Sequence, residues 1–375
     1  MRLVTSEQAI AIDNETINTF NISSKILMGN AGKKIANKAK EMVGYKFNLP
    51  ILFICGKGNN GGDGFAAALQ LHEEGYSVFI HFVIQKKDLE SNGRYFYKEC
   101  IKTSIEITYG LIHNVKNEPG LIVDGLIGVG LQGVVRDEIV PIINWINKSY
   151  VQVLSIDIPS GLDCNTGVFN PVCVNADVTI TFGNAKVGMF LRLSPEYCGE
   201  ILVEDIGLKS LEELNIKGLK WKLFNENIIR DYYKVIHKDM NKYSAGKVLI
   251  IAGSRGMTGA AVLATYGALR SGAGATVTVN PQSLNEIYEQ LIIEGMTLPL
   301  DDNKSGIITD KHYDSIMEKV YWADSVLLGP GLGRDVSTQK LIMKLFKNIK
   351  KPLVLDADGL FPFLNKFDLL NEREY

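Results

Sequence analysis

A glycine-rich segment with three polar side chains is the stretch of this sequence best suited to bind a small anionic ligand. Residues 56–64 hold five glycines together with Asn59, Asn60 and Asp63. An apolar run precedes the segment and another begins at Phe65, a pattern that predicts a strand, a loop and a helix. Backbone N–H groups at such a junction bind phosphate, and the side-chain oxygens suit a cation or sugar hydroxyls. The spacing matches neither G-x-G-x-x-G nor a Walker A loop, and a tight turn that needs positive φ is the alternative.

Two further strand ends carry side chains that could bind a ligand or transfer protons. Asp124 ends an apolar run before the glycine-rich stretch 125–133, and Asp157 begins the segment Asp-Ile-Pro-Ser-Gly-Leu-Asp at 157–163. We expect Asp157 to work as a general acid or base, or to bind hydroxyls, and Ser160 to add a cation ligand. The alternative for Asp124 is a role as a helix cap or turn residue. The alternative for Asp157 and Ser160 is that their side chains only stabilise a turn.

Other catalytic arrangements are disfavoured by the residue pattern. The serine in Pro159-Ser-Gly lacks a G-x-S-x-G elbow, and we expect the histidines of the first half to be structural. The five cysteines have no C-x-x-C spacing and no zinc-like cluster, which indicates buried, reduced thiols. Lys186 is a candidate charge for phosphate or substrate, with a solvated surface lysine as the alternative.

The composition argues against several classes of protein. A hydrophobic content of 46% and a charged content of 22% are typical of soluble globular chains. The net charge of −2 and the lack of a basic cluster argue against nucleic-acid binding. No apolar run approaches the ~20 residues of a membrane helix, and the N-terminus lacks the apolar core of a signal peptide. We therefore expect a cytoplasmic protein with neither nucleic acid nor membrane as a partner.

Strands that alternate with helices predict an α/β protein whose first sheet is parallel and doubly wound. Thr5 and Gln8 form a capping-box pattern for a first helix. Ser23 or Ser24 starts a second helix, with Ile26, Leu27, Ala31 and Ile35 along one face. Because ligands bind at the carboxyl ends of parallel strands, the three polar strand ends should converge on one site. The expected strands are 51–55, 76–83, 121–124, 151–157, 177–182 and 201–205, and the later helices are 65–71, 89–102 and 137–147.

A charged stretch at 209–222 predicts a domain boundary, which gives domains at 1–215 and 223–375. A second α/β pattern follows, with glycine-rich strand ends at 253–259 and 329–333. These two segments together predict a second ligand cleft. The expected strands of this half begin near 245, 275, 324 and 352.

These motifs resemble those of the NAD(P)H-hydrate repair proteins. Residues 55–64, 123–131 and 157–163 are similar, in this order, to the motifs of the NAD(P)H-hydrate epimerase domain, which has a Rossmann-like fold. The second half resembles the ADP- or ATP-dependent NAD(P)H-hydrate dehydratase domain, which has a ribokinase-like fold. The matching segments there are 242–254, 256–261, 269–274, 329–333 and 355–359.

The resemblance implies a bifunctional enzyme of nicotinamide nucleotide repair. Its isomerase domain would interconvert the R and S forms of NADHX and NADPHX, which are hydrated at C6 of the nicotinamide ring. Its lyase domain would remove water from the S form, with ADP or ATP and magnesium as cofactors. We expect these small molecules as substrates and a homo-oligomeric enzyme. A non-catalytic nucleotide-binding or scaffold protein is the alternative.

The resemblance also assigns roles to individual residues. Asp157 is the expected catalytic acid or base. Potassium would be held by Asn60, Asp124 and Ser160. In the dehydratase half, Ala260 and Gly331 would contact the nucleotide. The epimerase positions implied to bind it are Asn59, Asn60, Gly61, Gly62, Asp63, Gly128, Val129, Gly130, Leu131, Gln132, Gly133, Val134 and Asp157.

The family pattern continues after the Asp-Ala-Asp-Gly segment at 356–359 with motifs that this chain lacks. The missing motifs are a Pro-His-Pro-Gly-Glu-like segment, an adenylate-binding loop and a Gly-Ser/Thr-Gly-Asp-like motif with the catalytic aspartate. We therefore expect an incomplete ribokinase-like domain with impaired dehydratase activity. A parallel sheet that is left uncovered should expose apolar side chains and an unpaired edge.

Overall fold

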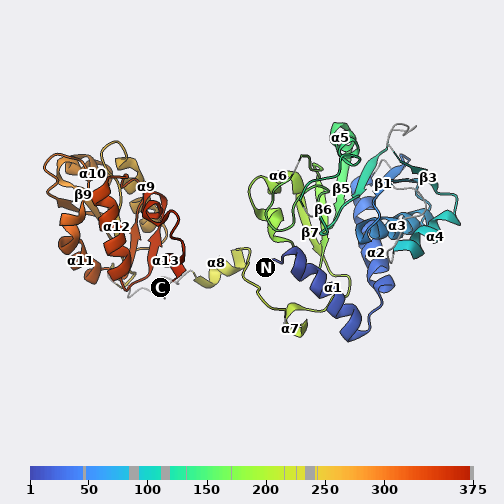
Figure 1. The fold of residues 1–375 in the computed structure, drawn as a ribbon, viewed down its shortest axis with the longest axis horizontal. Coiled ribbons are helices and arrows are strands. Elements are labelled where there is room, and N and C mark those ends of the chain that lie inside the picture. The colour runs from blue at the N-terminus through green and yellow to red at the C-terminus, as the bar shows by residue number, and fades with distance from the viewer. Residues whose placement is uncertain are drawn as a thin grey trace. The chain divides into compact units, whose positions relative to one another are not determined.

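The chain folds into two compact units, Met1–Tyr232 and Tyr233–Tyr375 (Figure 1). The computed structural model describes residues 1–44, 48–83, 93–110, 119–131, 133–169, 171–214, 216–224, 226–232, 241–242 and 244–371. The division lies C-terminal to the charged stretch where the sequence places a boundary. Within the first unit, Leu3 N–H donates to Trp221 O at 3.1 Å and Leu223 N–H donates to Met1 O at 2.8 Å. The segment around 221–223 therefore packs against the N-terminus, and the domain bounds drawn from the sequence stay a prediction.

The first unit is built on a parallel sheet of seven described strands in the order β3-β2-β1-β4-β5-β6-β7. The sequence predicts all of them except β3, which is mostly exposed and carries no apolar run. Ile54 of β1 is opposite Asp124 of β4, which in turn is opposite Ser155 of β5. Their bounds are β1 Ile51–Cys55, β2 Val78–Phe82, β3 Glu106–Tyr109, β4 Leu121–Gly125, β5 Gln152–Ile156, β6 Val178–Phe182 and β7 Glu200–Glu204.

The predicted capping residues begin the first two helices. Thr5 Oγ1 accepts from Gln8 N–H and Gln8 Oε1 accepts from Thr5 N–H, which completes the capping box. Ser23 caps the second helix, and Leu27, Ala31 and Ile35 of the expected face are buried. Ile26 is 56% exposed, so its assignment to that face is wrong. The helices are α1 Ser6–Phe20, α2 Ser24–Val43, α3 Asn59–Glu73, α4 Gly93–Ile101, α5 Val140–Lys148, α6 Ser194–Cys198, α7 Leu211–Leu214 and α8 Glu226–Tyr232, with a 3₁₀ helix η2 at Val187–Phe190.

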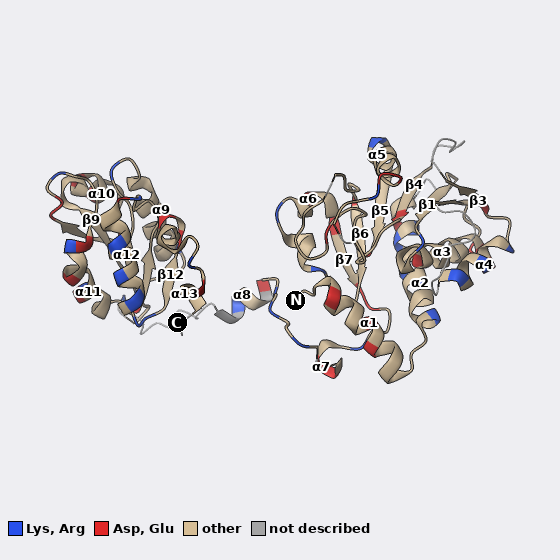
Figure 2. Cartoon of the chain, viewed as in Figure 1, with Lys and Arg blue, Asp and Glu red and all other residues tan. Residues whose placement is uncertain are grey.

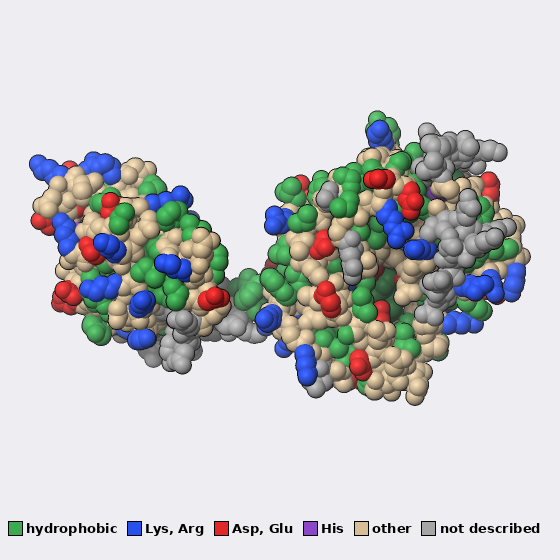
Figure 3. Space-filling view, in the orientation of Figure 1, with side chains coloured by type: hydrophobic (Ala, Val, Ile, Leu, Met, Phe, Trp, Pro, Cys, Tyr) green, Lys and Arg blue, Asp and Glu red, His purple; other side chains and the backbone are tan. Residues whose placement is uncertain are grey.

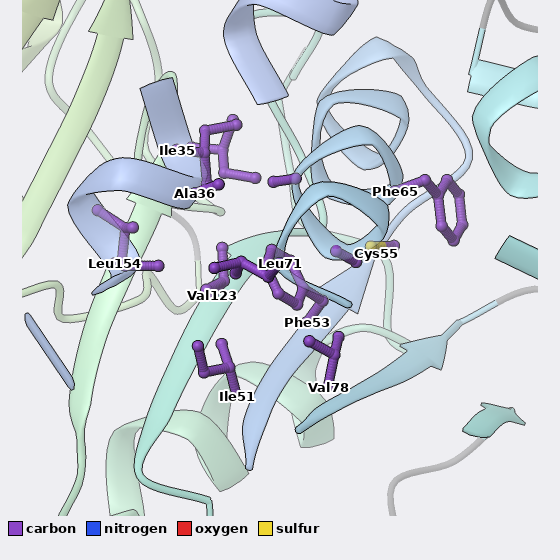
Figure 4. Close-up of a cluster of buried hydrophobic side chains, with 14 of the residues drawn as sticks. Ile35, Ala36, Ile51, Phe53, Cys55, Phe65, Leu71, Val78, Val123 and Leu154 are labelled. Carbon is purple, nitrogen blue, oxygen red and sulfur yellow. The ribbon is translucent and has the colours of Figure 1, made fainter. Parts of the chain in front are cut away.

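Helices cover both faces of the central strands, as expected for a doubly wound sheet. Successive residues of β1 point to opposite faces. On one face, Phe53 belongs to the same buried cluster as Phe65 and Leu71 of α3, and Figure 4 shows Leu71 beside Phe53. On the other face, Ile54 packs with Ile142 of α5 and its neighbours. All five residues of β1 are buried, which explains why this strand is an uninterrupted apolar run. The five cysteines are likewise free and buried, as predicted.

The second unit contains a parallel sheet of five described strands in the order β10-β9-β8-β11-β12. The sequence does not predict β10 because Pro299 lies inside it. Proline is tolerated in this strand because β10 is at the edge of the described sheet. The bounds are β8 Lys247–Ile251, β9 Ala275–Pro281, β10 Met296–Leu300, β11 Ser325–Leu328 and β12 Leu353–Leu355, with α9 Thr258–Arg270, α10 Asn285–Leu291, α11 Tyr313–Trp322, α12 Val336–Asn348, α13 Asp368–Asn371 and 3₁₀ helices η3 Gln282–Leu284, η4 Asp310–His312 and η5 Ala357–Phe363.

Helices also cover both faces of this second sheet. Leu249 and Ile251 pack with α11 and α12 on one face, and Ile250 packs with α9 and α10 on the other. The outer side of α12 carries exposed lysines, visible as blue bands in Figure 2. At the β12 edge, Val354 is 62% exposed. The two parallel sheets confirm the expected α/β fold class.

Charged side chains of both signs are interspersed on the face of the first unit seen in Figure 3. This mixture agrees with the net charge of −2. Among the described helices, none is both long and apolar enough to cross a membrane.

Candidate active site

A cavity of about 750 Å³ lies at the carboxyl ends of the strands of the first sheet. Its volume is in the usual range for small-molecule sites. Its walls come from α1, α2, the start of α3, the loops after β4 and β5, and the turn before η2. The three polar strand ends thus meet at one place. The sequence-predicted residues that line the cavity are Asn59, Asn60, Asp63, Gly128, Val129, Gly130, Leu131, Val134 and Asp157.

Not every predicted binding position reaches the cavity. Gly61 and Gly62 are buried within the first turns of α3, and Gly133 lies outside the lining. Gln132 falls outside the described residues.

The glycine-rich segment is different from the expected loop. Helix α3 begins at Asn59, so the polar residues of the segment lie in its first turns, and the start expected at Phe65 is wrong. The glycines of 56–64 do not have positive φ, so the tight-turn alternative is wrong as well. A Cβ on Gly61 would lie only 1.9 Å from Gly56 O. The glycines therefore allow the helix to pack closely against the strand ends.

The start of α3 is suited to an anion. Its N-cap is Gly58, whose lack of a side chain leaves the N–H groups of the first turn without a side-chain cap. Gly58, Asn59 and Asn60 all line the cavity. Lys57 and Arg136 also line it and add positive charge. A helix N-terminus beside two cationic side chains favours a phosphate group.

Asp124 is buried beneath the cavity, and its carboxylate accepts four hydrogen bonds. Ser160 donates to it twice, from Oγ to Oδ1 at 2.6 Å and from N–H to Oδ2 at 2.9 Å. Ser155 Oγ donates to Oδ2 at 2.9 Å, and Leu126 N–H donates to Oδ1 at 3.2 Å. Burial raises the pKa of Asp124 and these hydrogen bonds lower it, with burial the larger effect. Asp124 and Ser160 together hold the loops after β4 and β5 in contact.

Asn60 supplies the observation that bears on a cation. Both its side-chain nitrogen and its side-chain oxygen are buried without a hydrogen-bond partner. Such orphaned groups are rare in folded proteins and call for an unseen ligand or water. Gly125 and Gly128 lie close to Asn60, so Asn60 packs against the same loop that Asp124 and Ser160 organise. An amide, a carboxylate and a hydroxyl oxygen are suitable ligands for a hard monovalent cation, and the residues present fit potassium.

Asp157 is held in an unusual backbone conformation at the end of β5. Its φ is 64°, in the left-handed region that aspartate tolerates better than most residues. Its carboxylate oxygen Oδ1 forms an ion pair with Lys186 Nζ and accepts from Thr181 Oγ1 at 3.1 Å. Lys186 also donates to Thr181 Oγ1 at 2.6 Å. Lys186 is 3% exposed, so the surface-lysine alternative is wrong. Strained residues of this kind concentrate at functional sites.

Two more aspartates line the same cavity. Burial raises the pKa of Asp13, on α1, to about 6, and the negative charge of Asp157 acts in the same direction. Burial also raises the pKa of Asp63 well above its usual range, with Asp157 and Asp13 as further causes. Lys186 opposes both shifts. Asp13 lines the cavity and is exposed there. Three aspartates and one buried ammonium group therefore line the cavity.

Asp13 is one of several cavity residues that sequence reasoning missed, as are Lys57 and Arg136. Its helix was predicted from the capping box alone, and nothing in the local pattern distinguishes Asp13 from a solvated helix residue. Val4 N–H donates to Ala185 O at 3.1 Å and Val187 N–H donates to Val4 O at 3.0 Å. These two bonds fix the start of α1 beside Lys186, and this long-range pairing has no signature in the sequence.

The glycine-rich strand ends of the second unit also meet. Ser254 Oγ donates to Gly331 O at 2.8 Å, and Gly253 N–H donates to Pro330 O at 2.8 Å. A Cβ on Gly331 would lie 2.9 Å from Ala260 Cβ, so the two predicted nucleotide contacts are adjacent. Gly333 N–H donates to Asp358 Oδ2 at 3.0 Å, which joins the segment at 356–359 to the same cluster.

Comparisons with known proteins agree with this arrangement. A family model described as the N-terminus of YjeF-related proteins matches residues 24–188, and one described as NAD(P)H-hydrate dehydratase matches residues 248–374. A crystal structure of ADP/ATP-dependent NAD(P)H-hydrate dehydratase from Bacillus subtilis, co-crystallised with ATP and Mg²⁺, is 28% identical to the aligned part of this chain, with a TM-score of 0.30. That alignment covers 36% of this chain and 46% of that chain.

Similar full-length relatives span both units. The bifunctional NAD(P)H-hydrate repair enzyme Nnr of Dictyoglomus turgidum is 32% identical over 96% of this chain and 70% of the relative. The Nnr enzyme of Salinibacter ruber is 31% identical over 97% of this chain and 70% of the relative. The chain therefore belongs to the family of bifunctional NAD(P)H-hydrate repair enzymes.

Proposed function

We propose that the first unit is an NAD(P)H-hydrate epimerase that interconverts the R and S forms of NADHX and NADPHX. The observation that carries the proposal is the Asp157–Lys186 ion pair in a cavity that also contains the start of α3. The start of α3 suits a pyrophosphate, and the Asp157–Lys186 pair offers proton-transfer groups to a ring. Family membership supplies the substrate class.

The substrate would lie with its phosphates at Gly58–Asn60 and its hydrated ring at Asp157. Lys57 and Arg136 would balance the phosphate charge. The glycines of the loop after β4, which approach the cavity without side chains, would let the nucleotide lie against the backbone. Of these positions, Asn59, Asn60 and Asp157 are also implied by the resemblance, whereas Lys57, Gly58 and Arg136 are added from the structure.

The chemistry is inversion at C6, a carbon that bears both a hydroxyl group and the ring nitrogen N1. When the hydroxyl group takes a proton, the C6–O bond breaks and both bonding electrons leave with water. The N1 lone pair then forms a double bond to C6, which becomes planar. Water adds to the other face and loses a proton, which restores the hydrated ring. In our proposal Asp157 accepts that proton, and Lys186 positions its carboxylate.

The donor set at Asn60, Asp124 and Ser160 would hold potassium. A bound potassium ion would place positive charge under the loop after β4. Asn60 would offer its orphaned oxygen, Asp124 its carboxylate and Ser160 its hydroxyl oxygen. This loop lines the cavity, so the ion would position it for the substrate.

For the second unit, we propose that Ala260 and Gly331 contact the same nucleotide for ADP- or ATP-dependent dehydration of its S form. Their adjacency at the meeting strand ends supports this placement. Among the described residues, no group of three His, Cys, Asp or Glu side chains could hold a metal ion, so none is assigned to magnesium.

The test follows a mixture of R- and S-NADPHX by chromatography with the purified 375-residue chain. We expect rapid epimer equilibration in potassium chloride and a rate at least about tenfold lower with Asp157→Asn. Replacing potassium with tetramethylammonium should slow the wild type, and the variant Asn60→Ala should lose this cation dependence. NADPH recovery after ADP or ATP is added reports separately on dehydration. Binding of NADPHX without epimerisation would refute the proposal and favour the binding-protein alternative.

A further inference from the structure

Inversion at C6 needs two proton-transfer groups, and Asp157 supplies only one of them. Water departs from one face of the ring and arrives on the other. One group must therefore give a proton while a second group takes one, and the roles exchange in the reverse direction. A carboxylate fixed at one position by Lys186 serves only one of the two faces. This inference rests on the proposed epimerase function.

Asp13 has the properties that the second group needs. It lines the same cavity as Asp157, but it comes from α1, a different wall from β5. Among the described residues, its carboxyl group has no hydrogen bond or ion pair with another side chain, whereas Asp157 has Lys186 and Thr181. A carboxyl group that faces a cavity without a protein partner is available to a ligand.

The position of Asp13 is well fixed even though its carboxyl group is unpartnered. Two backbone hydrogen bonds join Val4 to the segment 185–187, directly before and after Lys186. Ser6 N–H donates to Asn165 Oδ1 at 2.7 Å at the start of the helix. One turn after Asp13, the buried Thr16 accepts from Lys209 N–H at 3.2 Å. The helix that carries Asp13 is therefore tied to the chain segment that carries Lys186.

We propose that Asp13 is a second catalytic residue of the epimerase site and forms an acid–base pair with Asp157. In one direction, the protonated Asp13 gives its proton to the C6 hydroxyl group, and the C6–O bond breaks to release water. Asp157 then takes a proton from the water that adds to the opposite face. In the other direction, Asp157 donates and Asp13 accepts. Each turnover moves one proton between the pair through solvent and needs no oxidant or reductant.

The charges around Asp13 suit this role. The groups that face it are Asp157 at the end of β5, Lys186 before η2 and Asp63 on α3. Because the pKa of Asp13 is raised to about 6, both of its forms are populated near neutral pH. Burial raises the pKa of Asp63 well above its usual range, so its carboxyl group gives up a proton less readily. Asp13 is therefore better suited than Asp63 to exchange protons.

The test compares Asp13→Asn with Glu15→Gln. Both changes remove one carboxylate from α1, but Glu15 is exposed, bonds to Thr19 and does not line the cavity. We expect kcat/KM for epimerisation to fall by roughly 10²–10³ in Asp13→Asn and to stay unchanged in Glu15→Gln. Asp13→Glu should recover part of the loss. NADPH binding, followed by its fluorescence, should change by less than about threefold in all three variants.

The pH profile separates catalysis from a structural role. Epimerisation needs one proton shared by the pair, so kcat/KM of the wild type should fall as pH rises through about 6. Glu15→Gln should keep this fall, whereas Asp13→Asn should lose it because an amide does not titrate. If Asp13→Asn epimerised at the wild-type rate, the assignment would be overturned. It would also be overturned if Asp13→Asn lost activity but kept the pH dependence of kcat/KM seen in the wild type. Loss of epimerisation in Asp63→Asn but not in Asp13→Asn would assign the role to Asp63. A wild type that does not epimerise would instead refute the proposed function itself.

Discussion

Removal of the buried ammonium group of Lys186 should destabilise the first unit strongly. The side chain is 3% exposed, and Nζ contacts both Asp157 Oδ1 and Thr181 Oγ1. The substitution Lys186→Met keeps most of the side-chain volume while it removes the charge. Asp157 would then lose its ion-pair partner while it still faces the carboxyl groups of Asp13 and Asp63.

The size of the effect follows from the burial of the pair. Breaking a buried ion pair by removing one partner costs about 3–5 kcal/mol. Asp157 is 16% exposed and faces a cavity that water can enter, so we expect the lower end, about 3 kcal/mol. For a unit of this size, each kcal/mol lowers Tm by roughly 2–4 °C, which predicts a fall of roughly 6–12 °C.

Differential scanning calorimetry at pH 7 is the assay, with two further variants. Lys186→Met/Asp157→Asn should recover part of the loss, because it removes the uncompensated carboxylate as well. Lys34→Met breaks an exposed pair with Glu204 and should cost less than about 1 kcal/mol. A fall of less than 2 °C in Lys186→Met, or a double variant less stable than the single one, would refute the charge argument.

Two further predictions concern stability. Gly61→Ala should lower the free energy of unfolding of the first unit by several kcal/mol, because the added Cβ would overlap Gly56 O. A Cβ added at Gly58 would have no atom within 4 Å, so Gly58→Ala should cost less than about 1 kcal/mol. Urea unfolding measures both. Equal losses in the two variants would contradict the close-packing explanation. Asp13→Asn should raise Tm above pH 6 but not near pH 4. The folded pKa of Asp13 is raised from 3.8 to about 6, so wild-type stability falls as pH rises across that window and stays lower above it. A Tm difference that is independent of pH would contradict this linkage.

Local chemistry in the sequence determined most of the first sheet. Strands such as β1 are apolar throughout because both of their faces are buried, and this is visible without a structure. The capping pattern of Thr5 and Gln8 is equally local, since it depends on residues three apart. The meeting of the three polar strand ends follows from parallel strand order, because the carboxyl ends of parallel strands lie at one edge. The strands that were missed, β3 and β10, are edge strands; β3 is mostly exposed and β10 contains Pro299.

Only the tertiary structure decided the roles of the charged residues. Lys186 is an ordinary lysine in its local sequence, and it becomes buried because the chain before η2 pairs with the N-terminal segment at Val4. The same pairing brings Asp13 to the cavity. The glycines of 56–64 are required by the close approach of α3 to the strand ends and not by their own backbone angles. Periodicity and capping are properties of residues close together in the sequence. The charge cluster is assembled from residues on α1 and α3 and from residues next to β5 and η2. It depends on contacts between residues far apart in the chain, which local sequence patterns do not encode.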